Sequence, residues 1–156
     1  MNIQPITEAY RERINSMLHK EWGSPIISRG KATEAENLPG FFSLSNDSIN
    51  GIITYNIDNK ECEIVTLNSF EESKGIGTAL VREVVAVAKE NDCYRLWLVT
   101  TNDNIGAIRF YQKKGFELIA LHVNAIEEAR VIKPCIPLIG MDKIPIKHEL
   151  EFEMRL

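Results

Sequence analysis

The sequence of 156 residues lacks the features that mark disulfide-stapled, metal-dependent or membrane-spanning proteins. It has only three cysteines, Cys62, Cys93 and Cys135, and none belongs to a Cys-x-x-Cys pair. This pattern predicts reduced thiols in a cytoplasmic protein. The three histidines have no zinc-ligand spacing, so we expect no metal. No apolar run approaches about 18 residues and residues 1–13 hold no apolar core, so we expect neither a membrane span nor a signal peptide.

The sequence also lacks an excess of basic residues. Lys and Arg number 18 against 22 Asp and Glu, which gives a net charge of −4. A nucleic-acid partner is therefore not expected, because the phosphate backbone requires basic protein surface. Apolar residues make up 44% and charged residues 26%, as in ordinary globular proteins. The length predicts one domain over residues 1–156.

Hydrophobic periodicity predicts helices and strands in mixed order along the chain. Helices are expected from Thr7 to the Trp22-Gly23 break, at 76–91, at 104–114 and, within an insert, at 125–131. Strands are expected at 2–6, 41–44, 49–57, 62–67, 94–99, 116–123 and 146–156, and residues 29–39 are expected to form a loop or weak helix. Turn-forming residues separate the strands at 41–67, which predicts an antiparallel meander. The fold class is therefore α/β (α+β), with a mixed, mostly antiparallel sheet of six to seven strands flanked by helices.

The last expected strand alternates strictly between apolar and charged residues. Ile146, His148 and Leu150 lie on its apolar side, whereas Lys147, Glu149 and the charged residues after them are expected to face water. An inward imidazole needs a hydrogen-bond partner or an aqueous cleft. His148 is thus either a satisfied, partly buried residue or a group that positions or deprotonates a substrate.

A glycine turn joins the strand at 62–67 to the helix at 76–91. It contains Lys74, Gly75 and Gly77, with Leu80 where a dinucleotide-binding fingerprint would have a third glycine. The Walker pattern is also absent. Glycines let the backbone approach a ligand, and the free amides of a helix N-terminus favour an anion such as a diphosphate. The alternative is that the glycines only shape the turn.

A second motif, Asn-x-x-Ala-x-x-Phe-Tyr-x-x-x-Gly-Phe, begins at Asn104, about 27 residues after the glycine turn. Its spacing places Asn104, Ala107 and Tyr111 on one helix face. The two motifs in this order, x-x-Gly-x-Gly-x-x-Leu and then the asparagine motif, resemble the GNAT superfamily of acetyl-CoA-dependent N-acetyltransferases. The matching core covers roughly residues 64–119.

The resemblance implies a fold with splayed central strands and acetyl-CoA as co-substrate. It implies that the pantetheine arm bonds to the backbone at about Val65 and Leu67, and that Asn104 contacts the cofactor. Tyr111 would lie near the thioester sulfur and protonate the departing thiolate. The resemblance places the diphosphate on the amides of Lys74, Gly75, Ile76, Gly77, Thr78 and Ala79. The family usually has Gln or Arg where this sequence has Glu72, and a carboxylate there opposes diphosphate binding unless it turns outward.

The general base is left open among several residues. Glu61 and Glu63 are expected to share a strand face with Val65 and Leu67 if alternation holds, and some family members use a glutamate on this strand. His122 and His148 are further candidates, and a water relay could replace a base. Cys62 and Cys93 are interpreted as packing residues. In this fold the first helix, the segment after it and the C-terminal strands usually wall the acceptor side. Here those parts include Trp22, Pro25, Ile26, Phe41, Phe42, Glu8, Glu12, Glu34 and Glu36.

The function expected from this resemblance is direct transfer of acetyl from acetyl-CoA to an amine of a small molecule or peptide. One alternative is a non-catalytic module of the same fold that senses acetyl-CoA, which Glu72 favours and Tyr111 disfavours. A second is an enzyme that binds a nucleotide or S-adenosylmethionine through the glycine turn, which the second motif disfavours. The expected partner is the amine acceptor, with neither nucleic acid nor membrane, and a homodimer is left open.

Overall fold

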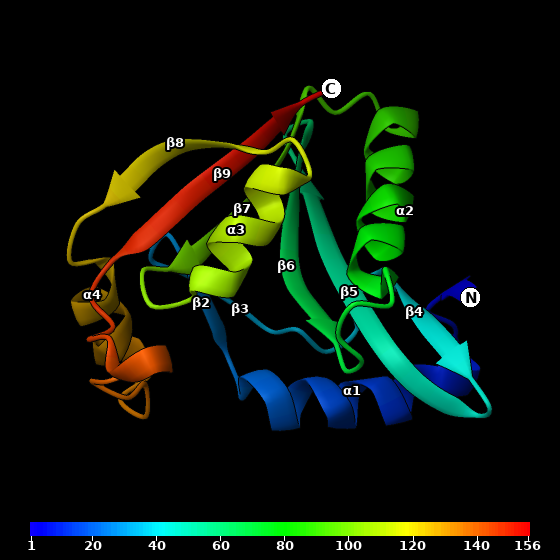
Figure 1. Cartoon of the computed structure of the whole chain (residues 1–156), viewed down its shortest axis with the longest axis horizontal. Helices are drawn as coiled ribbons and strands as arrows, with labels where there is room; N and C mark the ends of the chain where they lie inside the picture. Colours follow the sequence, from blue (N-terminus) through cyan, green and yellow to red (C-terminus); the bar gives the residue numbers. More distant parts are fainter. The chain divides into compact units, whose positions relative to one another are not determined.

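The computed structural model describes all residues from 1 to 156 (Figure 1). The chain forms two compact units, which are described in turn. The first unit contains Met1–Ile26, Glu34–Leu96 and Arg155–Leu156, and the second contains Ile27–Thr33 and Trp97–Met154. No helix is both long and apolar enough to cross a bilayer.

The first unit is built on four antiparallel strands in the order β1-β4-β5-β6. These are β1 (Asn2–Pro5), β4 (Gly40–Ser45), β5 (Ser48–Asp58) and β6 (Glu61–Ser69). Two-residue turns, Asn46-Asp47 and Asn59-Lys60, connect β4 to β5 and β5 to β6, and all four turn residues have positive φ. Asn and Asp tolerate this conformation, and such turns suit the twist of a hairpin. The predicted meander is confirmed.

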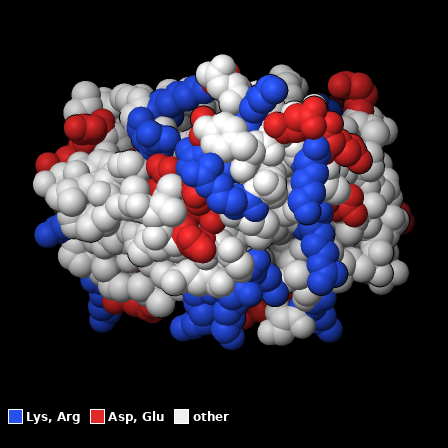
Figure 2. Space-filling model, turned by 90° about the horizontal axis from the view of Figure 1, so that it is seen from above, with Lys and Arg blue, Asp and Glu red and all other residues white.

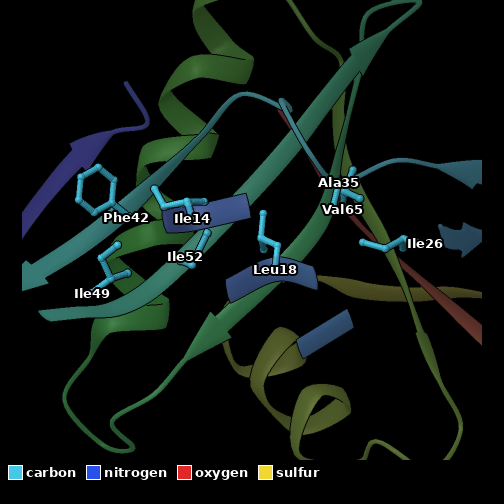
Figure 3. Packing of buried hydrophobic residues seen from close by; sticks show 8 residues of the cluster. All are labelled: Ile14, Leu18, Ile26, Ala35, Phe42, Ile49, Ile52 and Val65. Carbon is cyan, nitrogen blue, oxygen red and sulfur yellow. The ribbon is translucent and has the colours of Figure 1, made fainter. Parts of the chain in front are cut away.

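Two helices cover opposite faces of this four-stranded meander. Ile14 and Leu18 of α1 (Glu8–Trp22) are almost fully buried in a cluster with Phe42, Ile52 and other residues of the strands (Figure 3). α2 (Ile76–Glu90) packs on the other face, where Gly51 of β5 leaves room for it. Neighbouring residues of a strand point to opposite faces, so Gly51 faces α2 and Ile52 faces α1.

The second unit contains three strands in the order β7-β9-β8, with the helices α3 and α4. Its elements are β7 (Arg95–Thr101), α3 (Ile105–Lys113), β8 (Glu117–His122), α4 (Ala125–Ile132), the 3-10 turn η1 (Met141–Lys143) and β9 (Glu149–Arg155). β7 begins and β9 ends in the first unit. Tyr111 of α3 packs against Phe116 and against Phe152 of β9, with ring centroids 5.3 and 6.4 Å away.

Three expectations, about the segment at 26–33 and about the last strand, were wrong. Residues 26–33 form a short hairpin of β2 (Ile26–Ser28) and β3 (Lys31–Thr33), although part of this segment was expected to be a loop or weak helix. The charged side of the last strand was expected to face water, but Glu149 and Glu151 are only 2% and 4% exposed. The hairpin explains this burial, because Arg29 contacts both carboxylates. The strand is also shorter than expected and begins at Glu149.

The fold class agrees with the sequence analysis. Seven strands in a mostly antiparallel sheet, with four α-helices, make a mixed α/β fold. The predicted splay of the central strands stays a prediction. Basic and acidic side chains are interspersed with uncharged surface on the face that Figure 2 shows.

Candidate active site

The glycine turn presents a helix N-terminus that no side chain caps. Gly75 is the N-cap residue of α2, with φ +74°, and no side chain bonds to the first turn. That turn also holds no acidic residue, and the exposed Lys74 lies just before it. The first amides of a helix have no partner within the helix and carry a partial positive charge, so this end can hold an anion. Gly75 rather than Gly77 has the positive φ; Gly77 is the second residue of α2.

Glu72 lies in the same turn, on the surface. Its side chain is exposed, so water can screen its charge. The turn residue Ser73 has φ +60°, which is uncommon for a residue with a side chain. The exposed position of Glu72 fits a carboxylate that turns away from a bound diphosphate.

β6 carries a β-bulge at Val65, directly before the turn. Thr54 of β5 pairs with Thr66, but the next residue, Tyr55, pairs with Ile64, so Val65 is an extra residue. A bulge breaks the ladder, bends the strand and redirects its backbone groups. Val65 and Leu67, the residues expected to bond the pantetheine arm, therefore lie at and just beyond this irregularity.

The bulge overturns one expectation about the candidate bases. Glu61 and Glu63 were expected to share a face with Leu67, because all three have odd numbers. Residues that pair across two strands lie on the same face, and Leu67 pairs with Ile53 whereas Glu63 pairs with Asn56. Ile53 and Asn56 are three residues apart in β5, so they point to opposite faces. Glu61 and Glu63 therefore point away from the Leu67 side.

Glu61 also has a strong partner. Arg95 Nε lies 2.5 Å from Glu61 Oε1, and the Arg95 side chain is only 9% exposed. A hydrogen bond to Glu61 also raises the pKa of the neighbouring Tyr94 phenol. These contacts indicate that Glu61 neutralises a buried arginine, and its role as general base stays a prediction.

Asn104 and Tyr111 are placed by α3. Asn104 is the N-cap residue, and its Oδ1 accepts a hydrogen bond of 3.1 Å from the Ala107 amide. Asn and Asp favour this position because the side chain satisfies a helix amide. Tyr111 is 6% exposed, and burial among aromatic rings raises its pKa above the usual value near 10. It therefore keeps its proton at neutral pH, as an acid must before the thiolate leaves.

His148 is held by two loops. Its Nδ1 accepts a hydrogen bond of 2.8 Å from the Asn124 amide, and its own amide donates to Asn102 Oδ1 over 3.0 Å. The ring is partly buried. These contacts agree with the interpretation of His148 as a satisfied histidine, and they leave Nε2 to carry the proton when the ring is neutral.

Asn102 and Asp103 are positioning residues that the sequence analysis missed. Asn102 Oδ1 also accepts from the Lys147 amide, and its Nδ2 donates to the Pro145 carbonyl. Asp103 Oδ2 accepts a hydrogen bond of 2.9 Å from the Met141 amide. Both residues fix the insert between β8 and β9 directly beside Asn104. Their place between a strand and an N-cap asparagine is the only signal in the sequence that could have indicated them.

The cysteines fit structural roles. Cys62 is fully buried, and burial raises the pKa of its thiol to about 12. Burial also raises the pKa of Cys93. Neither thiol can ionise readily at neutral pH, as a nucleophile would have to. Cys135 is exposed and unpaired.

The acceptor-side residues named from the sequence fall into two groups. Phe42 is fully buried in the core with Ile14 and Leu18, so it cannot line a cleft. Trp22 is partly exposed, and its indole nitrogen donates a hydrogen bond of 2.6 Å to Asn68 Oδ1, next to Leu67. A shallow hollow of about 700 Å³ lies along α1, lined by Glu8, Arg11, Glu12, Asn15, Ser16, His19 and Glu36.

The predicted site residues are therefore divided between the two units. Val65, Leu67, Glu61 and the turn residues 74–79 lie in the first unit, whereas Asn104, Tyr111 and His148 lie in the second. In the first unit, the bulged strand, the glycine turn and the uncapped helix end follow one another along the chain, and such a helix end can hold an anionic group. No group of three or more His, Cys, Asp or Glu side chains is arranged to hold a metal ion.

Comparisons with known proteins agree with this class of site. A family model described as the acetyltransferase (GNAT) family matches residues 6–116. The uncharacterized protein YxbD of Bacillus subtilis (strain 168) is 44% identical over 153 residues, which cover 96% of this chain and 96% of YxbD. The chain belongs to the GNAT acetyltransferase family.

Solved structures share the fold at lower identity. The IAA acetyltransferase from Bacillus cereus ATCC 14579 has a TM-score of 0.76 at 22% identity, and the match covers 99% of both chains. A Bacillus subtilis acetyltransferase in complex with CoA has a TM-score of 0.71 at 17% identity, and the match covers 99% of this chain and 98% of the other. The second of these proteins binds CoA in its crystal structure.

Proposed function

We propose that this protein transfers the acetyl group of acetyl-CoA directly to a primary amine of a small molecule or peptide. The observation that carries the proposal is the path from the bulge at Val65 through the glycine turn to the uncapped N-terminus of α2. This path offers strand backbone groups for an amide-containing arm and helix amides for a diphosphate, which are the two polar parts of coenzyme A. Membership of the acetyltransferase family supports the same ligand.

The reaction needs an acid for the leaving thiolate, a base or water for the amine proton, and hydrogen-bond donors for the oxyanion. The amine nitrogen attacks the thioester carbonyl carbon, the carbon–sulfur bond breaks, and the thiolate leaves with a proton from an acid. The amine must lose a proton to a base or to water before or during attack. Backbone amides at the bulge of β6 would stabilise the oxyanion, and Tyr111 would donate the proton or a hydrogen bond to the thiolate. Burial raises the pKa of Tyr111, which keeps the phenol protonated but also makes it a weaker acid.

A sensor that binds acetyl-CoA without turnover is the second candidate, and one observation favours it. Tyr111 is almost fully buried against Phe110, Phe116 and Phe152, as a purely structural aromatic residue would be. The two functions differ in what removal of the hydroxyl does. Turnover depends on that hydroxyl only in an enzyme, whereas packing depends mainly on the ring.

The test combines binding with turnover. Acetyl-CoA should raise the melting temperature more than NAD or S-adenosylmethionine, because a ligand of the folded state stabilises it by RT ln(1 + [L]/Kd). Gly77→Val should remove this shift by filling the space at the start of α2, and Gly106→Val in α3 is the steric control. Release of free thiol in the presence of an amine panel then separates enzyme from sensor.

Tyr111→Phe separates the two roles of the tyrosine. For an enzyme that uses the phenol as acid, we expect turnover to fall by about 10- to 1000-fold with nearly unchanged affinity for coenzyme A. Equal turnover of wild type and Tyr111→Phe, with chemistry rate-limiting, would remove Tyr111 from the mechanism. No thiol release with any amine, together with a clear acetyl-CoA melting shift, would support the sensor.

A further inference from the structure

Two buried carboxylates of β9 form an unusual cluster in the second unit. Glu149 and Glu151 are 2% and 4% exposed and lie on the same face of the strand, two residues apart. This face is opposite Phe152, which packs against Tyr111. Buried acidic side chains require cationic or hydrogen-bonding partners, because loss of water destabilises their charged form.

The two glutamates differ in how well they are satisfied. Glu151 Oε1 lies 3.0 Å from His122 Nε2 and 3.3 Å from Arg29 Nε. Glu149 has fewer polar contacts. Its Oε2 accepts one long hydrogen bond of 3.3 Å from the Arg29 amide, and its Oε1 has no hydrogen-bond partner. Glu149 is thus an almost fully buried carboxylate with one oxygen that has no hydrogen-bond partner, in a cluster where Arg29 contacts both glutamates.

A second buried polar atom without a partner belongs to the residue before Arg29, whose amide contacts Glu149. Ser28, which precedes Arg29 at the end of β2, is 8% exposed, and its hydroxyl has no hydrogen-bond partner. Ser28 Oγ could accept a hydrogen bond from an ammonium group, as could Glu149 Oε1. Glu128 of α4 adds a further negative charge that acts on Glu149. Glu149 Oε1 and Ser28 Oγ are therefore two buried acceptors without a hydrogen-bond partner in this unit.

Arg29 shows which kind of group fits here. Its guanidinium carbon lies 5.4 Å from the centre of the Trp97 ring, and its side chain is 45% exposed. An organic cation thus already lies against an aromatic ring and a carboxylate, on the side of the cluster that water reaches. The guanidinium is partly in water, whereas its carboxylate partner is buried, so its displacement costs little only when another cation takes its place at the carboxylate.

We propose that Glu149 and Glu151, with Ser28 and Trp97, form a binding site for an organic cation, the ammonium or guanidinium group of the acceptor, which displaces the Arg29 side chain. The proposal rests on the proposed acetyltransferase function and adds a substrate class to it: acceptors that carry a second positive charge. Glu149 Oε1 receives a hydrogen bond from the cation, and Trp97 contributes a cation–π contact. A metal ion suits the cluster less well, because no group of three or more potential ligands is arranged to hold one.

The experiment uses three acceptors that share one primary amine and differ at the other end. They are 1,5-diaminopentane, with a cationic end, 5-amino-1-pentanol, with a neutral end, and 5-aminopentanoate, with an anionic end. Isothermal titration calorimetry measures binding without turnover, and thiol release measures KM and kcat. Wild type should bind the diamine at least about tenfold more tightly than the amino alcohol, since a charge-assisted hydrogen bond distinguishes them.

Two variants should move the affinity in opposite directions. Glu149→Gln should raise the Kd of the diamine by about tenfold or more and leave that of the amino alcohol unchanged. Arg29→Met keeps the length of the side chain but removes the competing cation, so it should lower the Kd of the diamine severalfold. Glu117→Gln on β8 is the control, because it is the same substitution at an exposed position. Glu149→Gln should fold, because it removes a buried charge that lacks a full set of partners.

The outcomes separate this site from the proposed function. If the diamine binds, Glu149→Gln weakens it and Arg29→Met tightens it, yet no amine is acetylated, the cation site stands and the enzyme proposal fails. If amines are acetylated but the cationic end gives no advantage in Kd or KM, the cation site is refuted and the enzyme proposal stands. An unchanged diamine Kd in Arg29→Met would also refute the site, and this variant decides the matter even if Glu149→Gln does not fold.

Discussion

Gly51 of β5 should tolerate no side chain, because α2 packs directly against it. A Cβ atom at this position would lie 2.4 Å from Ile76 Cγ2 and 3.0 Å from Leu80 Cδ1. Ordinary carbon–carbon contacts are about 3.5–4.0 Å, so α2 would have to move by roughly 1 Å. Ile76 and Leu80 are 3% and 0% exposed, which leaves little room for that movement.

We therefore expect Gly51→Ala to lower the free energy of unfolding by about 1–3 kcal/mol, the usual cost of overpacking a core. For a chain of this length this corresponds to a decrease of roughly 2–12 °C in melting temperature. Urea denaturation measures the change. Since Ile76 is the first residue of α2, directly after Gly75, the affinity for acetyl-CoA should fall together with the stability.

Gly106→Ala is the matched control, and its expected effect on stability has the opposite sign. Gly106 lies in the first turn of α3, and an added Cβ would meet only Asn104 Oδ1, at 3.9 Å. Gly106→Ala should therefore leave stability unchanged or raise it by up to about 1 kcal/mol, because alanine favours helices over glycine. In a double-mutant cycle, Gly51→Ala and Ile76→Ala should together cost about 1 kcal/mol less than the sum of the single changes. A wild-type melting temperature for Gly51→Ala would refute this account of the packing.

Three further predictions test the ionisable groups. Glu61→Gln should lower the free energy of unfolding by about 1–3 kcal/mol, since it removes the charge that lies 2.5 Å from the buried Arg95. A loss of turnover with normal stability would instead identify Glu61 as the base. A thiol reagent should label Cys135 rapidly and all three cysteines only in denaturant, and two fast thiols in the native protein would contradict the burial of Cys62 and Cys93. Burial raises the pKa of Glu149 above its value in the unfolded chain. As pH rises above about 4.3, the carboxyl ionises more readily in the unfolded chain, so wild type should lose stability relative to Glu149→Gln; a constant difference from pH 4 to 7 would show that the carboxyl is not desolvated.

Local turn and helix signals in the sequence predicted most of the fold. Asn46-Asp47 and Asn59-Lys60 indicated the hairpins because Asn and Asp accept positive φ. The apolar stripe of α2 predicted a helix that packs on a sheet, and the helix is found at Ile76–Glu90. The glycine turn and the asparagine motif also predicted where α2 and α3 begin, and the structure adds that Asn104 caps α3.

The features that were missed depend on contacts far along the chain. No Gly or Pro marks the bulge at Val65, which arises from the pairing of β5 with β6, so the face of Glu61 was predicted wrongly. The alternation in β9 correctly separated two faces of the strand. It could not show that the short hairpin around Arg29 covers the charged face, because a period of two is the same for a covered face and an exposed one.

The strand order β7-β9-β8 has a consequence for the path of folding. β9 lies between two strands that both precede it in the chain, and α3, β8 and α4 separate it from β7. The meander of the first unit needs only neighbouring strands and two-residue turns, and such local contacts form faster than distant ones. The amides of β4, β5 and β6 should therefore gain protection before those of β7 and β8 during refolding, and pulsed hydrogen exchange would show this order. Simultaneous protection of both sets would mean that the last strand joins the sheet at the same step as the hairpins.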